Sequence, residues 1–583
     1  MLATSLALAL MGMTPTKIDI VVRDLKDGDA LTGIRKLRVT VNSDQPVNQV
    51  EFYVGDNLRS NDTSTPYEFE IDPLNESEGN LKLTFAAYTA QGDNAKKTYT
   101  VKIDTGVSKG ADKNIEEGYT AMAKSQFDQA IYSGRVALKA KAGYNPARVL
   151  LARAFLSKGV FDKAQAFAED ALASDPNMDE ANEVLSGISL RKALETFLSS
   201  GQKRDVEPIR AALERGVSYR RKGLIRQFEA IGAPTDQNLI QYAKLALRAG
   251  RNNAAIQALS PQYRKDAKQT EIANLLAFAQ IRDADNAGAT LTLSYLEKAQ
   301  AMDAYSYGLK SILLVQAGKD GDADAAMSEA IGNDPDALGV KLAQTAIALK
   351  RNRTGALSNL VASLSKDESP RPEVNYYLSI LLNQMQSFVD ADKRFMTAIL
   401  AEPSSVDLLI ERGNQSVLMM TSGTTKDAEQ LKYQAQIAGA YFNAALTSQP
   451  DSPQALTAMV LYYTSTGDSA KALSYADGAV KAGPGYAAAH YAASMVYTAN
   501  AINNEREVAR MRKEAKTTLS AEELKKIGIY ENQARELTKK SAEALKKSIA
   551  LDTYGLDGRP VPSLNEAFTY FARHGRIPYL VGP

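Results

Sequence analysis

The residues that most often carry enzyme chemistry are scarce in this chain. Its 583 residues contain two histidines, His490 and His574, and no cysteine. The lack of cysteine excludes disulfide frameworks, thiolate catalysis and zinc sites built on cysteine. His490 falls in a helical segment at a position where an aromatic side chain usually packs. His574 precedes Gly575 at the end of a short terminal helix, where a cation complements the helix dipole. We interpret both histidines as structural.

A run of aspartates from Asp320 to Asp324 imitates the first half of a calcium-binding loop. The sixth position of that loop is Ala325, where the turn requires glycine, and the twelfth is Ile331, where calcium requires a carboxylate. The match therefore fails. A second acidic set is left open as an alternative calcium site: Asp56, Asp62 and Asp72.

Motifs for other reaction types are also missing. The sequence has no glycine-rich phosphate loop, no Gly-x-Ser-x-Gly elbow and no His-Glu-x-x-His helix. We therefore predict no catalytic residues, no cofactor, no metal and no enzymatic activity. The charge also limits the partners, because 69 Lys and Arg residues balance 68 Asp and Glu residues. Such a chain has no overall field to attract nucleic acid, and no nucleic-acid partner is predicted.

Segment 1–16 contains an apolar run, Leu2 to Met13, which has the character of a secretory signal although no basic residues precede it. Export to the periplasm or cell surface is the favoured location, and the cytoplasm is the alternative if the run is not a signal. At about a dozen residues the run is too short to span a bilayer. No other segment is long and apolar enough, so no transmembrane span is predicted.

Residues 17–105 alternate between apolar and polar side chains with a period of two, as a half-buried antiparallel sheet requires. Val50, Phe52 and Val54 form one such face, and about six segments of this kind follow one another. Stretches such as Gly55 to Asn57 supply turns between them. Short strands at this spacing predict a β-sandwich.

The same region resembles the bacterial Ig-like domains of surface and secreted proteins. The residues that carry the resemblance are the segments Val50 to Tyr53, Pro66 to Phe69 and Ala87 to Gly92. The resemblance implies a spacer or adhesive module and supplies no catalytic residues.

From residue 111 the pattern becomes helical within a longer period of about 34 residues. Segment 145–178 has small residues at Ala152, Ala164 and Ala171, where two antiparallel helices approach closely. Phe155 and Phe161 are predicted to fill the groove between these helices. The register recurs about eight times between 111 and 553, with degenerate units near 179–235 and 269–301 and a split unit at 487–553.

This pattern resembles the tetratricopeptide repeat (TPR) family, which implies an all-α solenoid, a right-handed superhelix of antiparallel helix pairs. The fold class expected for the whole chain is thus an N-terminal all-β Ig-like sandwich followed by this solenoid. Insertions near 421–437 and 501–541 interrupt the period, and Ser520 with Glu523 forms a capping box. Residues 554–583, with a second capping box at Ser563 and Glu566, are predicted to cap the last repeat.

In the TPR family the concave groove is lined by the first helix of each pair, and it binds a protein or a peptide. The ninth position of each repeat contains no asparagine here, which argues against the clamp that some members use for a peptide's terminal carboxylate. The residues predicted from the resemblance to bind a partner are Tyr119, Arg153, Lys244, Arg248, Tyr376, Ile380, Asn383 and Gln384.

The favoured function is a non-enzymatic protein-interaction scaffold of the bacterial cell envelope. One alternative is a carbohydrate-binding or polysaccharide-export accessory protein, although the chain has no tryptophan for an exposed sugar platform. Another is a non-catalytic subunit of an enzyme complex. The sequence leaves the partner and the oligomeric state open.

Overall fold

The computed structural model describes residues 17–199, 205–351, 353–367, 371–385, 387–421, 427–514 and 519–551, together with Phe571 and Gly582. The predicted signal segment 1–16 and the capping box at Ser563 and Glu566 lie outside these residues, and so does His574. The chain forms two compact units, Met1–Val184 and Leu185–Pro583. Each unit has its own core and is described by itself.

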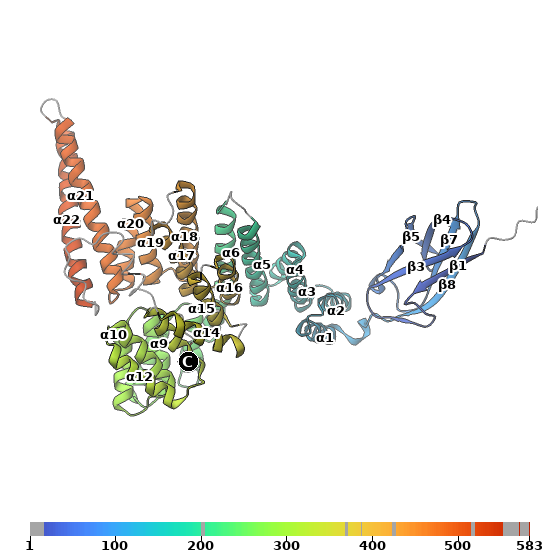
Figure 1. Ribbon diagram of the computed structural model, residues 1–583, viewed down its shortest axis with the longest axis horizontal. Helices are drawn as coiled ribbons and strands as arrows, with labels where there is room; N and C mark the ends of the chain where they lie inside the picture. The colour runs from blue at the N-terminus through green and yellow to red at the C-terminus, as the bar shows by residue number, and fades with distance from the viewer. Residues whose placement is uncertain are drawn as a thin grey trace, which may run out of the picture. The chain divides into compact units, whose positions relative to one another are not determined.

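The first unit begins with a sandwich of two sheets (Figure 1). One sheet has three strands in the order β1-β3-β6, and the other has five in the order β2-β8-β7-β4-β5. Only β2 and β8 pair in parallel. The strands are β1 (Ile18–Arg23), β2 (Ala30–Leu31), β3 (Arg35–Ser43), β4 (Val47–Val54), β5 (Asn57–Asp62), β6 (Tyr67–Ile71), β7 (Gly79–Thr89) and β8 (Asn94–Ile103).

Aromatic rings fill the space between the two sheets. The ring centroid of Phe52 on β4 lies 5.4 Å from that of Phe69 on β6 and 5.0 Å from that of Phe85 on β7. All three side chains are buried, as the period-two pattern predicts. Rings at such distances add attraction beyond the area they remove from water. The sandwich core therefore comes directly from the alternation in the sequence.

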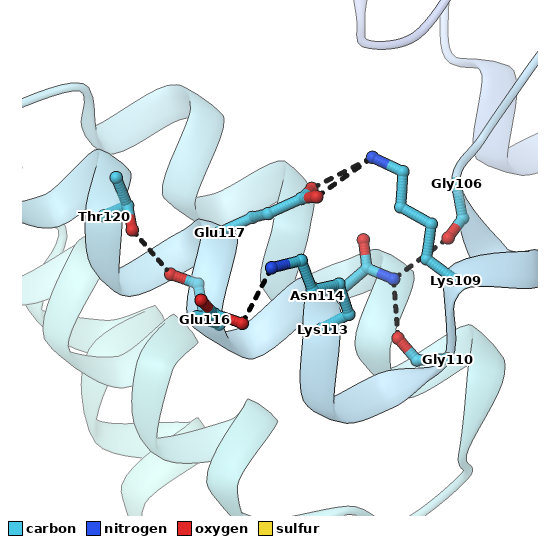
Figure 2. A network of polar contacts seen from close by, with 8 residues as sticks. All are labelled: Gly106, Lys109, Gly110, Lys113, Asn114, Glu116, Glu117 and Thr120. Carbon is cyan, nitrogen blue, oxygen red and sulfur yellow. Dashed lines mark hydrogen bonds and ion pairs between the residues drawn. The ribbon is translucent and has the colours of Figure 1, made fainter.

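A short junction connects the sandwich to the first helix, α1 (Ala111–Ala123), as Figure 2 shows. The Asn114 side-chain amide donates to the carbonyl oxygens of Gly106 (3.0 Å) and Gly110 (2.8 Å). Lys109 forms an ion pair with Glu117 at 3.0 Å. Asn114 is buried, so its hydrogen bonds satisfy two carbonyl groups that would otherwise be costly to desolvate.

The sandwich also packs against the second helix, α2 (Phe127–Ala140). Leu74, in the short 3₁₀ helix η1 (Pro73–Asn75), joins Tyr132 and Val136 of α2 in an apolar cluster that Val107 of η2 (Val107–Lys109) borders. Arg135 pairs with Asp72, and the Lys139 ammonium group donates to the Leu74 carbonyl oxygen at 2.6 Å. Sandwich and first helical pair thus share a small mixed interface.

The helices that follow come in antiparallel pairs (Figure 1). Their bounds after α1 and α2 are α3 (Asn145–Ser157), α4 (Phe161–Ser174), α5 (Asp179–Ser199), α6 (Glu207–Ala230), α7 (Leu239–Arg248), α8 (Asn252–Lys265), α9 (Thr270–Arg282), α10 (Asn286–Lys298), α11 (Ala304–Gln316), α12 (Asp320–Asn333), α13 (Leu338–Lys350), α14 (Thr354–Asp367), α15 (Pro372–Gln384), α16 (Phe388–Ala401), α17 (Val406–Thr421), α18 (Ala428–Ser448), α19 (Pro453–Thr466), α20 (Ser469–Ala482), α21 (Ala487–Glu514) and α22 (Ala521–Leu551).

Small residues let the paired helices approach closely, as expected. Ala152 of α3 and Ala164 and Ala171 of α4 are fully buried. At Gly118 of α1, a Cβ atom would come within 2.3 Å of the Leu150 side chain of α3, so no larger residue fits without repacking. Phe155 of α3 stacks on Phe167 of α4 with a centroid distance of 5.8 Å. The degenerate units near 179–235 and 269–301 also form helical pairs, α5 with α6 and α9 with α10.

The second unit folds back on itself, because helices far apart in the sequence are in contact. Helix α6 packs against α18, and the Arg221 guanidinium Nε donates to the Ser448 carbonyl oxygen at 2.9 Å. Gln454 of α19 donates to the carbonyl oxygen of Arg282, the last residue of α9, at 3.1 Å. The Arg282 side chain also pairs with Asp407 of α17 at 3.4 Å. A simple stack of repeats lacks such contacts, since each repeat then touches only its neighbours.

The two longest helices, α21 and α22, form the last hairpin of the described residues and lie side by side (Figure 1). They contain the charged insertion 501–541. The predicted capping box begins α22: the Ser520 backbone N–H donates to Glu523 (2.8 Å), and the Glu523 N–H donates to the Ser520 hydroxyl (3.2 Å). None of the helices in the described ranges is long and apolar enough to cross a membrane.

Candidate functional site

Two of the predicted partner-binding residues come together in the first unit. The guanidinium carbon of Arg153, on α3, lies 5.9 Å from the centroid of the Tyr119 ring on α1. Arg153 also pairs with Glu183 of α5 at 3.3 Å. Burial raises the pKa of Tyr119, so its hydroxyl stays protonated near neutral pH. The first helices of three successive pairs therefore share one polar and aromatic cluster.

Two other predicted residues, Lys244 and Arg248, line a cavity of about 310 Å³ in the second unit. They lie one helical turn apart on α7, so their side chains share one face of the helix. The opposite part of the lining comes from residues 401–406, where α16 ends and α17 begins. The charged residues of the lining are Arg220, Lys244, Arg248, Arg282, Glu373 and Glu402.

The cationic side chains of this cavity are held in different ways. Lys244 pairs with Glu271 at 3.1 Å, and both side chains are well exposed, so this pair contributes little stability. Arg282 is half-buried between Asp407 and the Phe278 ring, whose centroid lies 5.8 Å from its guanidinium carbon. Arg248 is exposed and makes no ion pair or hydrogen bond with any described residue. It is the cation most available to a ligand.

Burial also affects the acid that faces Arg282. It raises the pKa of Asp407 above the usual range, and the attraction of Arg282 only partly opposes this. The two groups are 3.4 Å apart. A polar ligand that pairs with Arg282 would therefore compete with a carboxylate that is itself poorly solvated.

The predicted residues of α15 are placed differently. Tyr376 and Ile380 are only 6% and 8% exposed and belong to the large apolar core of the second unit. Asn383 is half-buried near the end of the helix. The side chain of Gln384 lies outside the described residues. In this conformation Tyr376 and Ile380 offer little surface to a partner.

Two cations of the cavity, Arg220 and Arg282, have no counterpart among the predicted site residues. Both lie on α6 and α9, in units whose repeat pattern is degenerate, so no groove register could be assigned to them. The cavity also depends on contacts between α9 and α17, and no local pattern in the sequence signals those contacts. The sequence feature that could have pointed to Arg220 is the group of arginines in the α6 segment, Arg215, Arg220 and Arg221.

The remaining motif residues have ordinary structural roles in the described parts. Arg351 pairs with Asp320 (2.8 Å) and with Asp324 (2.6 Å) at the start of α12. A ring nitrogen of His490 lies 3.1 Å from the Pro484 carbonyl oxygen, and burial lowers the pKa of this histidine. Among the described side chains, no group of three or more His, Asp or Glu is arranged to hold a metal ion.

The N-terminal sandwich has a match among known families. Residues 24–103 match the bacterial Ig domain. The match covers most of the eight-stranded region and none of the α-helices. No curated protein matches the chain.

Solved helical-repeat structures are similar to the chain at low identity. A tetratricopeptide repeat protein from Parabacteroides merdae has 14% identity and a TM-score of 0.29, with 47% of this chain and 99% of that chain covered. Yeast Tom70 has 12% identity and a TM-score of 0.32, with 76% and 99% covered. The Cut9 and Hcn1 hetero-tetramer of the APC/C has 11% identity and a TM-score of 0.36, with 77% and 95% covered.

The fold is therefore an N-terminal bacterial Ig domain followed by a TPR-like solenoid of paired helices. The pairs themselves carry this conclusion, because their small buried residues and their spacing follow the repeat pattern of the sequence.

Proposed function

We propose that the protein is a non-enzymatic scaffold of the bacterial cell envelope, which binds a partner protein through an extended segment of that partner. The bacterial Ig domain supports an extracellular or surface location, since such domains serve there as spacers. The helical pairs support an interaction role, because solenoids offer long surfaces for binding.

One observation carries the proposal for the binding site. Lys244 and Arg248, predicted from the sequence to face the groove, line the same cavity as Arg220 and Arg282. A concave site with a few convergent polar groups and apolar walls is the usual form of a ligand site. The cluster of Tyr119, Arg153 and Glu183 in the first unit is a second contact point of the same polar and aromatic character.

The test is a crosslinked capture from envelope extract with the full chain as bait. The bait is compared with Arg248→Glu, and with Arg264→Glu as a matched control. Arg264 is an exposed arginine on α8 outside the cavity lining, so it carries the same charge change without touching the site. We expect the wild-type chain to locate to the envelope fraction and to capture defined proteins there.

Charge reversal at Arg248 should remove those proteins, whereas reversal at Arg264 should retain them. If both variants capture the same proteins equally well, the partner binds outside the cavity. The scaffold proposal itself fails if the folded full chain captures nothing, or if the chain is found only in the cytoplasm.

A further inference from the structure

The cavity of the second unit exists because distant parts of the chain meet. Its cations lie on α6, α7 and α9, and the facing wall includes Ser404, Ser405 and Val406 at the beginning of α17. The ion pair of Arg282 with Asp407 joins these two sides, and a hydrogen bond from Gln454 of α19 to the Arg282 carbonyl oxygen holds the end of α9. The site is therefore built by the fold-back, and the groove of successive first helices does not supply it alone.

The balance of charges in the lining favours a ligand with a small negative charge. Four cations face two acids, Glu373 and Glu402. Lys244 and Arg282 already have carboxylate neighbours, whereas Arg248 has none among the described residues. One open guanidinium can receive one carboxylate in a charge-assisted, two-pronged hydrogen bond. The four cations and two acids leave the lining with a small net positive charge, which matches one carboxylate better than a polyanion.

The start of α17 adds to this preference. Helix α17 has 16 residues, and its first-turn N–H groups carry a partial positive charge. One of them, the Leu408 N–H, is bonded to the Ser405 hydroxyl at 3.4 Å. The helix beginning thus adds a partial positive charge to the lining, and Asp407 in its first turn pairs with Arg282.

The apolar part of the lining narrows the ligand class further. Leu224, Leu247, Leu275 and Phe278 form a continuous wall on α6, α7 and α9. A free phosphate or a small inorganic anion would leave this wall in contact with water. An acidic residue next to an apolar residue in a peptide would fill both parts of a cavity of about 310 Å³.

We infer that this cavity binds an acidic side chain and an adjoining apolar residue of a partner peptide, with Arg248 as the receiving cation. The inference rests on the proposed scaffold function and names the chemistry of its partner. The ligand is an internal acidic segment, whose side-chain carboxylate Arg248 receives.

The test begins with a random-sequence peptide display selected against the immobilised full chain. Selected peptides are then measured in solution by fluorescence anisotropy with the full chain and two variants: Arg248→Gln and the control Arg264→Gln. We expect the selected peptides to be enriched in Asp or Glu beside an apolar residue. Loss of one charge-assisted bond should weaken their binding about tenfold in Arg248→Gln and leave the control unchanged.

Two further measurements sharpen the result. Replacing the acidic residue of the peptide by its amide should cause the same loss, and this loss should disappear in Arg248→Gln. Thermal unfolding of each variant shows that it is folded.

The outcomes separate the two proposals. If peptides bind without acidic enrichment, or bind Arg248→Gln as tightly as wild type, the inference is wrong while the scaffold function stands. If neither peptides nor envelope proteins bind the folded chain, both are wrong.

Discussion

Asp283 shows how a single residue can tie the fold of the second unit to pH. It lies directly after α9 and is half-buried. Burial, with smaller effects from the negative charges of Asp451 and Asp285, raises its pKa to about 7. Asp451 belongs to the turn before α19 and Asp285 to the turn before α10, so two distant turns place like charges together.

The sign of the pH effect follows from the two pKa values. An unfolded aspartate has a pKa of about 3.9, whereas the folded state keeps its proton until about pH 7. Between these values the folded state binds more protons than the unfolded state. The free energy of unfolding should therefore fall as the pH rises from about 4 to 7 and then level off.

We predict that Asp283→Asn is more stable than wild type at pH 8, by on the order of 1 to 3 kcal/mol, and that the difference shrinks at pH 5. Urea unfolding followed by circular dichroism at both pH values measures this. Asp322→Asn, at an exposed position of α12, is the control and should change little at either pH. A stabilisation of equal size at both pH values would show that Asp283 is not the group that titrates.

For single residues, the sequence could predict a position in the groove only where the repeat register was readable. Lys244 and Arg248 were placed from the register of a clear repeat, and they line the cavity. Arg220 and Arg282 were not found, because their units are degenerate. The repeat position of Tyr376 predicts that it faces the groove. It is buried instead, because the surrounding helices of the second unit pack over it.

At the scale of elements, a single substitution can test the junction between the Ig domain and α2. Leu74 of η1 packs against Tyr132 and Val136, and the pair of Asp72 with Arg135 lies beside them. An aspartate at position 74 would place a charge in this apolar cluster, which is costly. The Ig domain itself has a separate core of aromatic rings and does not depend on Leu74.

We predict that Leu74→Asp releases the Ig domain from α2 without unfolding it. Hydrogen exchange should become faster in α2 and η1 and stay slow in β4 and β7. Leu58→Asp is the matched control, because Leu58 is 52% exposed on β5 and the same substitution there should leave α2 protected. Faster exchange throughout the sandwich would contradict this separation.

The elements that the sequence did not predict have a common physical reason. Two strands, β2 and β5, exceed the six expected from alternation. Strand β2 has two residues, which is too short for a period to be seen, and β5 is a polar edge strand with nearly every residue exposed. An edge strand has only one neighbouring strand and must avoid aggregation with other chains. Its side chains therefore need not alternate between apolar and polar. Gly55, at a φ of 61°, makes the turn that leads into β5. The predicted turn at Gly55 to Asn57 was therefore the feature of the sequence that could have indicated a following strand.

For the molecule as a whole, the decisive feature is that the second unit is more than a linear array. In a linear array, stability is a sum of nearest-neighbour interfaces, and unfolding can proceed repeat by repeat. Here α6 contacts α18, and Gln454 of α19 holds the end of α9. The sequence predicted the repeats, since their packing is local, but it could not predict the fold-back, whose contacts join segments with no shared pattern.

We predict that Arg221→Ala weakens the cooperativity of the second unit more than its stability. The substitution removes the donor to the Ser448 carbonyl oxygen, and the loss of one such bond costs about 1 to 3 kcal/mol. Because this bond joins α6 to α18, its loss should let the two ends of the unit unfold separately. Urea unfolding should then show a lower slope against denaturant or two transitions. Arg264→Ala, on the exposed face of α8, should keep the wild-type slope. A wild-type slope in Arg221→Ala would mean that neighbouring repeats alone hold the unit together.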